Sequence, residues 1–445
     1  MNSIFAQCTA PGKAGVAVFR LSGPDSLMAL EQLIIQKVDN LEPRKLYFKK
    51  IYNPKTKQQI DEAMVVFFIG NASFTGETSV EIHTHGSISV IKQMHQVLSS
   101  INGMRLAQPG EFAKRSFLNG KMDLTAAEGL ADLIDAETEF QHKQAIRQLG
   151  GGLEKIYDNW RKELLSLISL LEAYIDFPDE DIPDETVQHV ADKITRLVFD
   201  INNHLNDNNR GERLRGGLKL AIIGKPNVGK SSLLNFLMKR EVAIVSDIAG
   251  TTRDVLEGHL DIGGYPIILQ DTAGIHHDTK DIIEQKGIEK AKETFHSSDI
   301  RIIIYDATET NSKTDDFAEL INENTIILLN KIDLAELKIP SNLGLKKPLA
   351  ISIKKNIGLE QVVKRIIEVA ENIAKPSEAP QITRARHRAQ LEQAITYLTN
   401  FTLEDDLVLV TEDIRMAIRS LSNITGKITV DEILGEIFSN FCIGK

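Results

Sequence analysis

The first part of the chain alternates hydrophobic and polar positions in short runs that predict β-strands. Residues 79–84 (SVEIHT) show this alternation, and a period of two is typical of a strand with one buried face. Apolar positions at helical spacing predict a helix over residues 88–98. Residues 1–118 are therefore expected to form one α+β domain. Further strand-like runs lie at residues 16–21, 46–52 and 63–69.

The pattern changes to a helical period over residues 119–215, where glycine is scarce. An acidic loop, IDFPDEDIP at residues 175–183, interrupts it and raises the question of a calcium site. An EF-hand loop needs glycine at its sixth position, whereas this loop contains two prolines, so we interpret it as an ordinary connection between helices. Apolar residues repeat at the spacing of one helix face at Trp160, Leu164, Leu165, Ile168 and Leu171.

Strand–loop–helix alternation follows over residues 216–375 and predicts an α/β domain. The sequence KPSEAP (residues 375–380) is typical of a linker. The part of the chain at residues 376–445 then shows helical periodicity again. Helical segments on both sides of an α/β block indicate that the block is inserted into one helical domain, with the two helical parts at 119–215 and 376–445.

Composition excludes several classes of protein. The chain has 445 residues and a formal net charge of −10, which disfavours a protein that coats nucleic acid non-specifically. Its two cysteines, Cys8 and Cys442, are too few for a disulfide scaffold and favour a reduced, cytoplasmic protein. There is no basic and apolar leader at the N-terminus and no apolar run long enough to cross a bilayer, so we expect no secretory signal and no membrane span.

A phosphate-binding loop is the strongest chemical signal. The apolar run at residues 219–223 leads directly into GKPNVGKS (residues 224–231) and then into an apolar helix. In this context, backbone N–H groups of a glycine-rich loop and the helix N-terminus bind phosphates. Lys230 is expected to reach the outer phosphates, and the Ser231 hydroxyl to ligate Mg²⁺.

A second motif, NKID at residues 330–333, indicates which nucleotide base is bound. It follows the apolar run at residues 325–329. The Asp333 carboxylate can accept hydrogen bonds from N1 and the 2-amino group of guanine, and adenine lacks this donor pair. Between the two motifs lie GTTRD (residues 250–254) and DTAG (residues 271–274), in the order typical of the switch segments of GTPases.

The attacking water cannot be oriented as it is in small G proteins, because this chain has Ile275 where those proteins often have a glutamine. The candidates that follow are Asp278, Asp281, Glu284 and Glu289, and the residues alone do not choose among them. Positive charge near the phosphates can come from an arginine of a partner protein. It can also come from a K⁺ ion on the Asn227 amide oxygen, unless Asn227 only caps the loop.

Taken together, these motifs resemble the MnmE (TrmE) family of tRNA modification GTPases. The resemblance covers nearly the whole chain and rests also on FTGE (residues 74–77), residues 109–136, AYIDFP and the terminal FCIGK (residues 441–445). It implies a multidomain α/β fold. This fold has an N-terminal tetrahydrofolate-binding-like and dimerisation domain at residues 1–118, a helical domain, and an inserted P-loop GTPase domain with a doubly wound sheet.

The resemblance also implies an activity. In this family a K⁺-stimulated, Mg²⁺-dependent GTPase works as a homodimer with an FAD-dependent partner, MnmG (GidA). Together they install a carboxymethylaminomethyl-type group at C5 of wobble uridine 34 in certain tRNAs. The one-carbon unit comes from 5,10-methylene-tetrahydrofolate, and glycine or ammonium supplies the amine. Because no dinucleotide-binding G-x-G-x-x-G follows a strand in this chain, FAD is expected only through the partner.

Family roles are carried over residue by residue. Glu284 would orient the attacking water, although the spacing from Gly274 is about one residue longer than in the family. Mg²⁺ would lie on Ser231 and Thr252, and K⁺ on Asn227, Ser246, Ile248 and Thr251. Folate would contact Arg20, Glu81, Lys121 and Lys445. The GTP site would comprise Asn227, Val228, Gly229, Lys230, Ser231, Ser232, Ser246, Asp247, Ile248, Ala249, Gly250, Thr251, Thr252, Asp271, Thr272, Ala273, Gly274, Asn330, Lys331, Asp333 and Ser352.

The sequence leaves alternative interpretations for several residues and for the function. Cys442 is either a buried small residue at the end of an apolar helix or a participant in the modification. The arginines at 384, 386 and 388 either face solvent or contact tRNA phosphates, and His83 and His85 are either structural or metal ligands. A regulatory GTPase of ribosome assembly and a folate-dependent carrier are the rival functions, although no KH-type GxxG loop supports the first.

Overall fold

The computed structural model describes residues 2–176, 184–240, 243–244, 258–270, 295–308, 317, 319–334, 347–400, 407–428, 431–439, 441–442 and 444. These residues divide into two compact units that are each built from several stretches of the chain. The first unit is Met1–Ala131, Leu149–Leu170 and Arg415–Lys445, and the second is Asp132–Gln148 and Leu171–Ile414.

The first unit contains a six-stranded sheet in the order β3-β4-β5-β2-β1-β6. Its neighbours pair antiparallel except β1 and β6, which are parallel. The four strand-like runs and the helix expected in this region are confirmed, whereas β1, β6 and α1 were not predicted. The elements are β1 (Ser3–Gln7), β2 (Ala14–Ser22), α1 (Ser26–Ile34), β3 (Tyr47–Tyr52), β4 (Gln59–Phe68), β5 (Ser79–Gly86), α2 (Ile88–Ser100) and β6 (Met104–Leu106).

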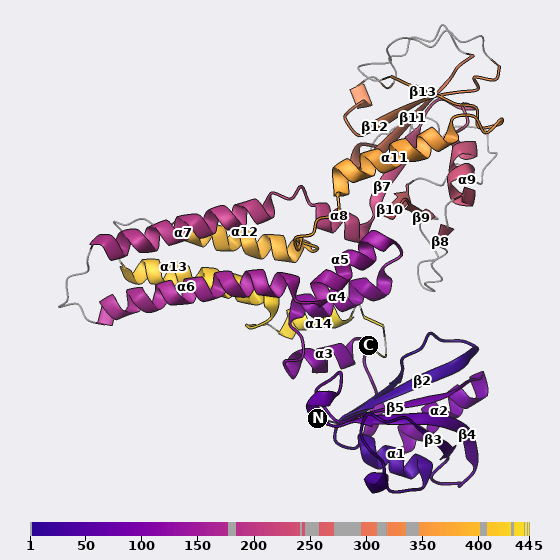
Figure 1. The fold of residues 1–445 in the computed structure, drawn as a ribbon, viewed down its shortest axis with the longest axis vertical. Helices are drawn as coiled ribbons and strands as arrows, with labels where there is room; N and C mark the ends of the chain where they lie inside the picture. Colours follow the sequence, from indigo (N-terminus) through magenta and orange to yellow (C-terminus); the bar gives the residue numbers. More distant parts are fainter. Residues whose placement is uncertain are drawn as a thin grey trace. The chain divides into compact units, whose positions relative to one another are not determined.

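Helices α1 and α2 cover one face of this sheet (Figure 1). The alternation along β2 explains this arrangement, because Phe19 and Leu21 point into the core with Leu30 of α1 and Met94 of α2. The intervening Arg20 therefore points to the opposite face, which carries the polar residues of the candidate folate site.

Helices from both ends of the chain complete the first unit. Helix α14 (Asp431–Ser439) packs on α3 (Glu111–Leu118) through a cluster of buried apolar side chains. Helix α6 (Gly152–Asp176) contacts α13 (Leu407–Thr425) where Arg161 Nε donates to Ser422 Oγ at 3.1 Å. The cluster between α3 and α14 consists of Ala113, Leu124, Ala127, Leu434, Phe438 and Phe441.

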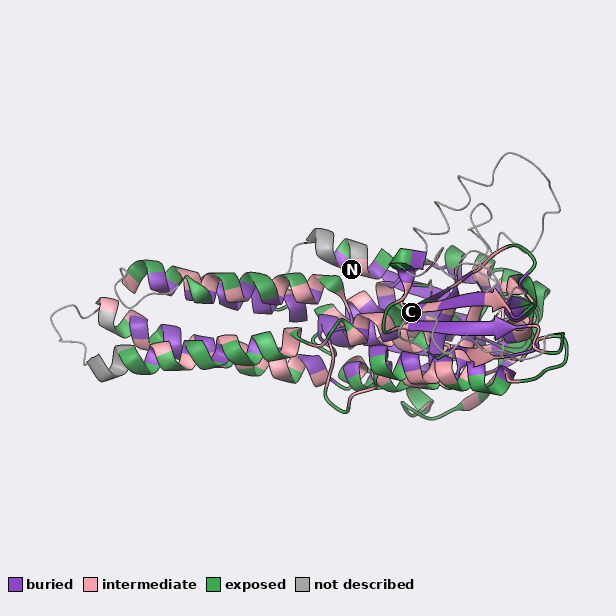
Figure 2. Ribbon diagram, turned by 90° about the horizontal axis from the view of Figure 1, so that it is seen from above, coloured by how far each residue is buried: buried purple, intermediate pink, exposed green. Residues whose placement is uncertain are grey.

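Long amphipathic helices flank the second sheet in the sequence. Helix α7 (Asp184–Leu205) packs against α12 (Ala385–Thr399). Its buried residues recur every three or four positions, which is the stripe visible along the long helices in Figure 2. These residues are Val190, Ile194, Leu197 and Ile201. The helical period expected on both sides of residues 216–375 is confirmed.

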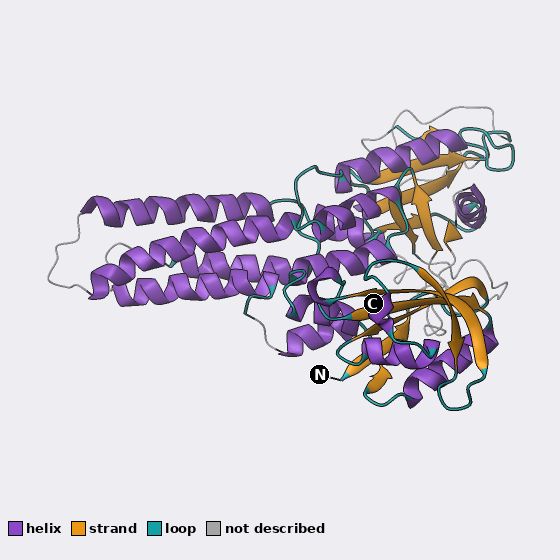
Figure 3. Cartoon of the chain, turned by 60° about the horizontal axis from the view of Figure 1, so that its bottom comes forward, coloured by secondary structure: helices purple, strands orange, loops and turns teal. Residues whose placement is uncertain are grey.

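The second unit contains a seven-stranded sheet in the order β13-β12-β11-β7-β10-β9-β8. The strands from β13 to β10 in this order are parallel, β9 pairs antiparallel with β10, and β8 pairs antiparallel with β9. The expected α/β sheet is thereby confirmed (Figure 3). Its elements are α8 (Arg210–Gly216), β7 (Leu218–Ile223), α9 (Lys230–Arg240), β8 (Ala243–Ile244), β9 (Gly258–Ile262), β10 (Tyr265–Leu269), β11 (Ile300–Asp306), β12 (Thr325–Asn330), β13 (Leu349–Ala350) and α11 (Leu359–Ala374).

Both faces of this sheet are covered by apolar side chains. Leu218 and Leu220 of β7 pack with α9 and α11, while Ala221 and Ile223 pack on the other face with Phe295. The carboxyl ends of the parallel strands β7, β11 and β12 meet at one edge, which is where open α/β sheets bind ligands.

Candidate nucleotide-binding site

The phosphate-binding loop connects β7 to α9, as the sequence predicts. Gly224 follows the strand, and a Cβ at this position would collide with the carbonyl oxygen of Ile304 on β11. Gly229 has a φ of +110°, and a Cβ there would collide with the Asn330 side chain. Only glycine fits both positions, so the backbone of the loop can lie directly against its neighbouring strands.

Lys230 begins α9 and lies across the loop. Its Nζ donates to the carbonyl oxygens of Gly224 at 2.7 Å and of Lys225 at 2.8 Å. Burial lowers the pKa of the Lys230 ammonium, because desolvation disfavours its charged form. A phosphate group beside this ammonium would stabilise its positive charge, so the loop is suited to bind phosphate.

Asn227, Ser231 and Ser232 are exposed around this lysine, whereas Val228 is buried and anchors the loop in the core. Asn227 adopts a φ of +62°, which asparagine tolerates better than most residues. Its side chain forms no hydrogen bond with any residue that the structure describes, so the loop-capping alternative has no support there. The amide oxygen is available to a ligand.

Asn330 joins the loop that follows β12 to the phosphate-binding loop. Its Nδ2 donates to the Val228 carbonyl oxygen at 2.7 Å, and its Oδ1 accepts from the Ile353 N–H at 3.2 Å. Because Asn330 is almost completely buried, these two bonds satisfy a side chain that water does not reach. Three loops are therefore held in one arrangement by one amide.

Asp333 is oriented by Ser352, a contact that the sequence did not reveal. The Ser352 hydroxyl donates to Asp333 Oδ1 at 2.6 Å and accepts from the Lys355 N–H at 3.1 Å. The hydrogen bond from Ser352 lowers the pKa of Asp333, so the carboxylate is ionised at neutral pH. The side chain of Ile353, next to Ser352, packs beside Gly229 of the phosphate-binding loop.

Asp306 is a further residue of this site that sequence reasoning missed. It ends β11, and its Oδ2 forms an ion pair with Lys331 Nζ at 2.6 Å. The available signal was a carboxylate at the carboxyl end of an apolar strand, IRIIIYD.

Thirteen predicted site residues lie outside the described residues, and their roles stay predictions. Gln270, the described residue before Asp271, donates its N–H to the Leu220 carbonyl oxygen at 2.9 Å, which holds the end of β10 beside β7. The residues concerned are Ser246, Asp247, Ile248, Ala249, Gly250, Thr251, Thr252, Asp271, Thr272, Ala273, Gly274, Glu284 and Lys445.

The first unit brings together two of the residues expected to bind folate. Arg20 on β2 pairs with Glu81 on β5 at 3.0 Å, and the guanidinium lies 5.3 Å from the ring centre of Phe74. His83 Nε2 lies 3.5 Å from the other Glu81 oxygen. Lys121 instead donates to the Asn71 carbonyl oxygen at 2.7 Å.

The cysteines differ in their surroundings. Cys8 Sγ lies 3.1 Å from the Gly444 carbonyl oxygen, and burial raises the pKa of its thiol. Cys442 lies beyond the end of α14 and is exposed, so the interpretation as a buried small residue is wrong. The backbone turns back toward α3 there, since the Gly110 N–H donates to the Cys442 carbonyl oxygen.

Two of the three arginines after the linker, Arg384 and Arg388, make ion pairs, so the solvent-facing alternative is wrong for these two, whereas contact with tRNA phosphates stays a prediction. Arg384 and Arg215 both donate to Asp132 Oδ1, at 2.7 and 2.8 Å. Arg388 pairs with Asp207 at 2.7 Å and Glu212 at 3.3 Å.

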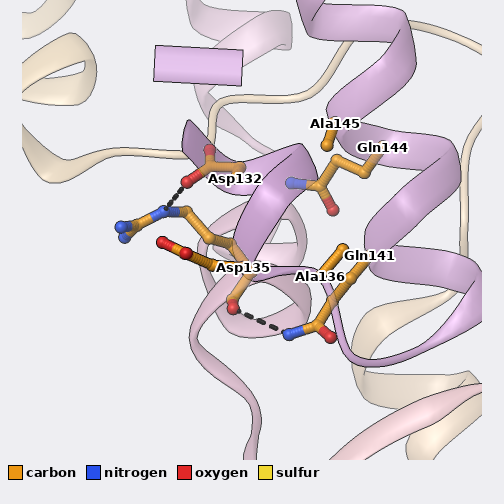
Figure 4. A pocket seen from close by; sticks show the side chains of 7 residues that line it. Asp132, Asp135, Ala136, Gln141, Gln144 and Ala145 are labelled. Carbon is orange, nitrogen blue, oxygen red and sulfur yellow. Dashed lines mark hydrogen bonds and ion pairs between the residues drawn. The ribbon is translucent and has the colours of Figure 1, made fainter. Parts of the chain in front are cut away.

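Asp132 and Arg215 also line a small pocket between the end of α4 (Leu124–Asp135) and α5 (Glu139–Leu149), shown in Figure 4. Gln141 crosses it and donates to the Arg215 carbonyl oxygen at 3.1 Å. The polar groups of this pocket therefore connect helices to each other.

No group of three or more metal-ligating side chains occurs among the described residues, and His85 pairs with Asp61 at 2.8 Å. Of the helices that the structure describes, none has the length and hydrophobicity to cross a membrane.

Comparison with known proteins decides the family. The model of the GTP-binding protein TrmE N-terminus matches residues 3–121, and the model of the MnmE helical domain matches residues 124–442. The chain belongs to the MnmE family.

MnmE relatives are similar over their whole length. The tRNA modification GTPase MnmE of Rickettsia canadensis (strain McKiel) is 58% identical over 450 residues, which cover 100% of both chains. That of Rickettsia rickettsii (strain Sheila Smith) is 59% identical over 447 residues, again covering 100% of both. Among solved structures, the cytosolic domain of the Thermotoga maritima FeoB iron transporter covers 47% of this chain and 98% of its own. This similarity, with 20% identity and a TM-score of 0.27, is too low to support a functional comparison.

Proposed function

We propose that this chain is a GTP hydrolase that takes part in tRNA modification. The observation that carries the proposal is the guanine-reading arrangement, in which an ionised Asp333, oriented by Ser352, belongs to the same loop as the Asn330 that fixes the phosphate-binding loop. The MnmE relatives, named tRNA modification GTPases, agree with it over their full length.

The described residues explain how GTP would be held. Backbone N–H groups of residues 224–229 and the N-terminus of α9 would bind the phosphates, and Lys230 would exchange its contacts with loop carbonyls for contacts with phosphate oxygens. Ser231, exposed on the first turn of α9, would hold Mg²⁺ together with Thr252. The bound Mg²⁺ would neutralise charge on the phosphates.

Potassium would supply the further positive charge at this site. The exposed Asn227 amide fits a monovalent cation, because its oxygen is a hard ligand that no described residue occupies. Ser246, Ile248 and Thr251 would complete its coordination. Glu284 would orient the attacking water in place of the glutamine that the chain lacks.

Folate binding would occur on the sheet of the first unit. Arg20 and Glu81 each keep about a quarter of their side chains exposed, at 24% and 22%, so both can reach a ligand beside Phe74. A cation here suits the glutamate tail of 5,10-methylene-tetrahydrofolate. Lys121 and Lys445 would extend the site, and the exposed Cys442 remains a candidate for the modification.

The assembly that we propose is a cytoplasmic homodimer formed through residues 1–118. An MnmG (GidA)-type protein would bring FAD, and the product would be a carboxymethylaminomethyl-type group at C5 of wobble uridine 34. The proposed inserted GTPase domain is residues 216–375, between helical parts at 119–215 and 376–445.

Loss of the protein tests this activity in cells. In a strain that lacks the chain, we expect modified wobble uridine 34 to disappear from tRNA hydrolysates analysed by mass spectrometry. The wild-type gene should restore it, and a Lys230→Ala gene should not, since the phosphate site would be damaged. Normal wobble uridine together with immature ribosomal subunits would support the regulatory GTPase of ribosome assembly instead.

Base recognition is testable at Asp333. Asp333→Asn should move preference from guanine to xanthine nucleotides, because an amide donor replaces one carboxylate acceptor and xanthine carries a carbonyl where guanine has its amino group. We expect guanine affinity to fall on the order of 10-fold to 100-fold, measured by titration with GDP and XDP. Unchanged preference would show that NKID does not read the base.

A further inference from the structure

The ion pair between Asp306 and Lys331 joins the end of β11 to the loop that carries the base-reading Asp333, and the nucleotide motifs do not account for Asp306. Asp306 faces Asn330 in the parallel register of β11 and β12, and the Ala307 N–H donates to the Asn330 carbonyl oxygen at 2.8 Å. The backbone positions of Asp306 and Lys331 are therefore fixed by the sheet, and the pair follows from the ends of two adjacent strands.

Both oxygens of the Asp306 carboxylate are engaged. Oδ1 accepts from the Thr308 N–H at 2.9 Å and the Thr308 hydroxyl at 2.7 Å, and Oδ2 contacts Lys331 Nζ at 2.6 Å. Burial alone would raise the pKa of Asp306, but the hydrogen bonds from Lys331 and Thr308 outweigh it and hold the pKa below its usual value. The carboxylate is a fixed anion with the ammonium as its counter-ion.

Lys331 is held in an uncommon backbone conformation, with a φ of +67°. It is two residues before Asp333, whose carboxylate has one oxygen on Ser352. Lys354 and Lys355 also act on Asp333 through their charge, but neither forms an ion pair with it in the described part of the chain. A cation that reached Asp333 would occupy the acceptor that guanine needs.

We propose that Asp306 is a specificity-determining positioning residue, which holds the Lys331 ammonium away from Asp333 and so keeps that carboxylate free for the N–H groups of guanine. The inference rests on the proposed function, because it concerns how the same site reads its base. Without the anion at 306, the Lys331 ammonium would turn to Asp333, the carboxylate in its own loop. The ammonium would then compete with the base for that carboxylate.

The test compares GDP with IDP, whose hypoxanthine base lacks the 2-amino group of guanine. A hydrogen bond to a carboxylate contributes roughly 10-fold to 100-fold in affinity, so the wild-type chain should prefer GDP by about that factor. Asp306→Asn keeps the shape of the side chain but removes its charge. We expect this variant to reduce the preference to below about 3-fold, mainly by weakening GDP binding.

A second substitution separates positioning from a merely structural role. In Asp306→Asn/Lys331→Met the ammonium is absent but the apolar stem remains, so the preference for GDP should return to near the wild-type ratio. Lys331→Met alone is the matched control. Because Lys331 belongs to the predicted GTP site, this variant should bind GDP and IDP more weakly, but by the same factor, so that their ratio is kept. All proteins are full-length chains, titrated with fluorescent nucleotides after their thermal unfolding midpoints are compared.

Three outcomes would overturn the role of Asp306: an unchanged ratio in Asp306→Asn, equal weakening of GDP and IDP, or a double variant that stays unselective. Failure of the proposed function looks different, because the wild-type chain itself would then bind ADP as well as GDP. An Asp306→Asn protein that unfolds more easily does not weaken the test, since the double variant lacks the same carboxylate.

Discussion

Glu284→Ala is expected to lower the rate of GTP turnover by a factor on the order of 10²–10⁴ while GTP affinity stays nearly unchanged. A group that positions the attacking water acts in the transition state and contributes little to ground-state binding. Single-turnover hydrolysis and nucleotide titration on the same preparation separate the two effects. The prediction is based on Ile275, whose side chain cannot orient water as a glutamine at this position would.

Asp278→Ala and Asp281→Ala are the matched controls, since both remove a carboxylate from the same segment. They should slow turnover far less than Glu284→Ala. A normal rate in Glu284→Ala beside an inactive Asp281→Ala would show that the family role belongs to the other carboxylate, as the longer spacing from Gly274 allows. Activity in all three variants would direct attention to an arginine from a partner.

Turnover in K⁺ is expected to exceed turnover in Na⁺, at equal ionic strength, by a factor on the order of 10². A cation held by the Asn227 amide would stabilise charge that develops on the phosphates in the transition state, and the larger K⁺ would fit where Na⁺ does not. Steady-state GTP hydrolysis in the two chlorides measures the ratio.

Asn227→Ala provides the control for this effect, because it removes the amide oxygen from an exposed position with little disturbance to the core. The variant should hydrolyse GTP at one low rate in both salts. Equal rates in the wild-type protein would refute the K⁺ mechanism, and a salt difference that survives in Asn227→Ala would place the cation elsewhere.

The sequence predicted the elements that carry strong periodicity. The alternation over residues 79–84 became β5, and the apolar runs 219–223 and 325–329 became the buried strands β7 and β12. Local pattern decides these elements, because β5 alternates between two different environments, whereas β7 and β12 are short apolar runs in a sheet that is covered on both faces. The phosphate-binding loop was equally predictable, since its glycines and Lys230 act through backbone geometry close in the sequence.

The contacts that tune the site were not predictable, because they join residues distant in the chain. Ser352 orients Asp333 from another loop, and Asp306 meets Lys331 only because β11 and β12 are neighbours in the sheet. Arg384, which precedes α12, and Arg388 within it show the same limit, because their partners are also distant in the sequence. Their charge predicted an exposed row or a phosphate site, but carboxylates from α4, α8 and the residues before α8 pair with Arg384 and Arg388.

The packing of α14 on α3 has a consequence for how the chain is made. Ala113 and Leu124 emerge from the ribosome early, but Phe438 and Phe441, which bury them, are translated last. This apolar surface therefore stays uncovered while the nascent chain grows, and contacts between distant segments form slowly. The second unit, whose residues are all translated before position 415, can fold while the first still waits for its final helix. Premature termination near the 3′ end of the message would then release a chain with a folded nucleotide site and an aggregation-prone amino-terminal unit.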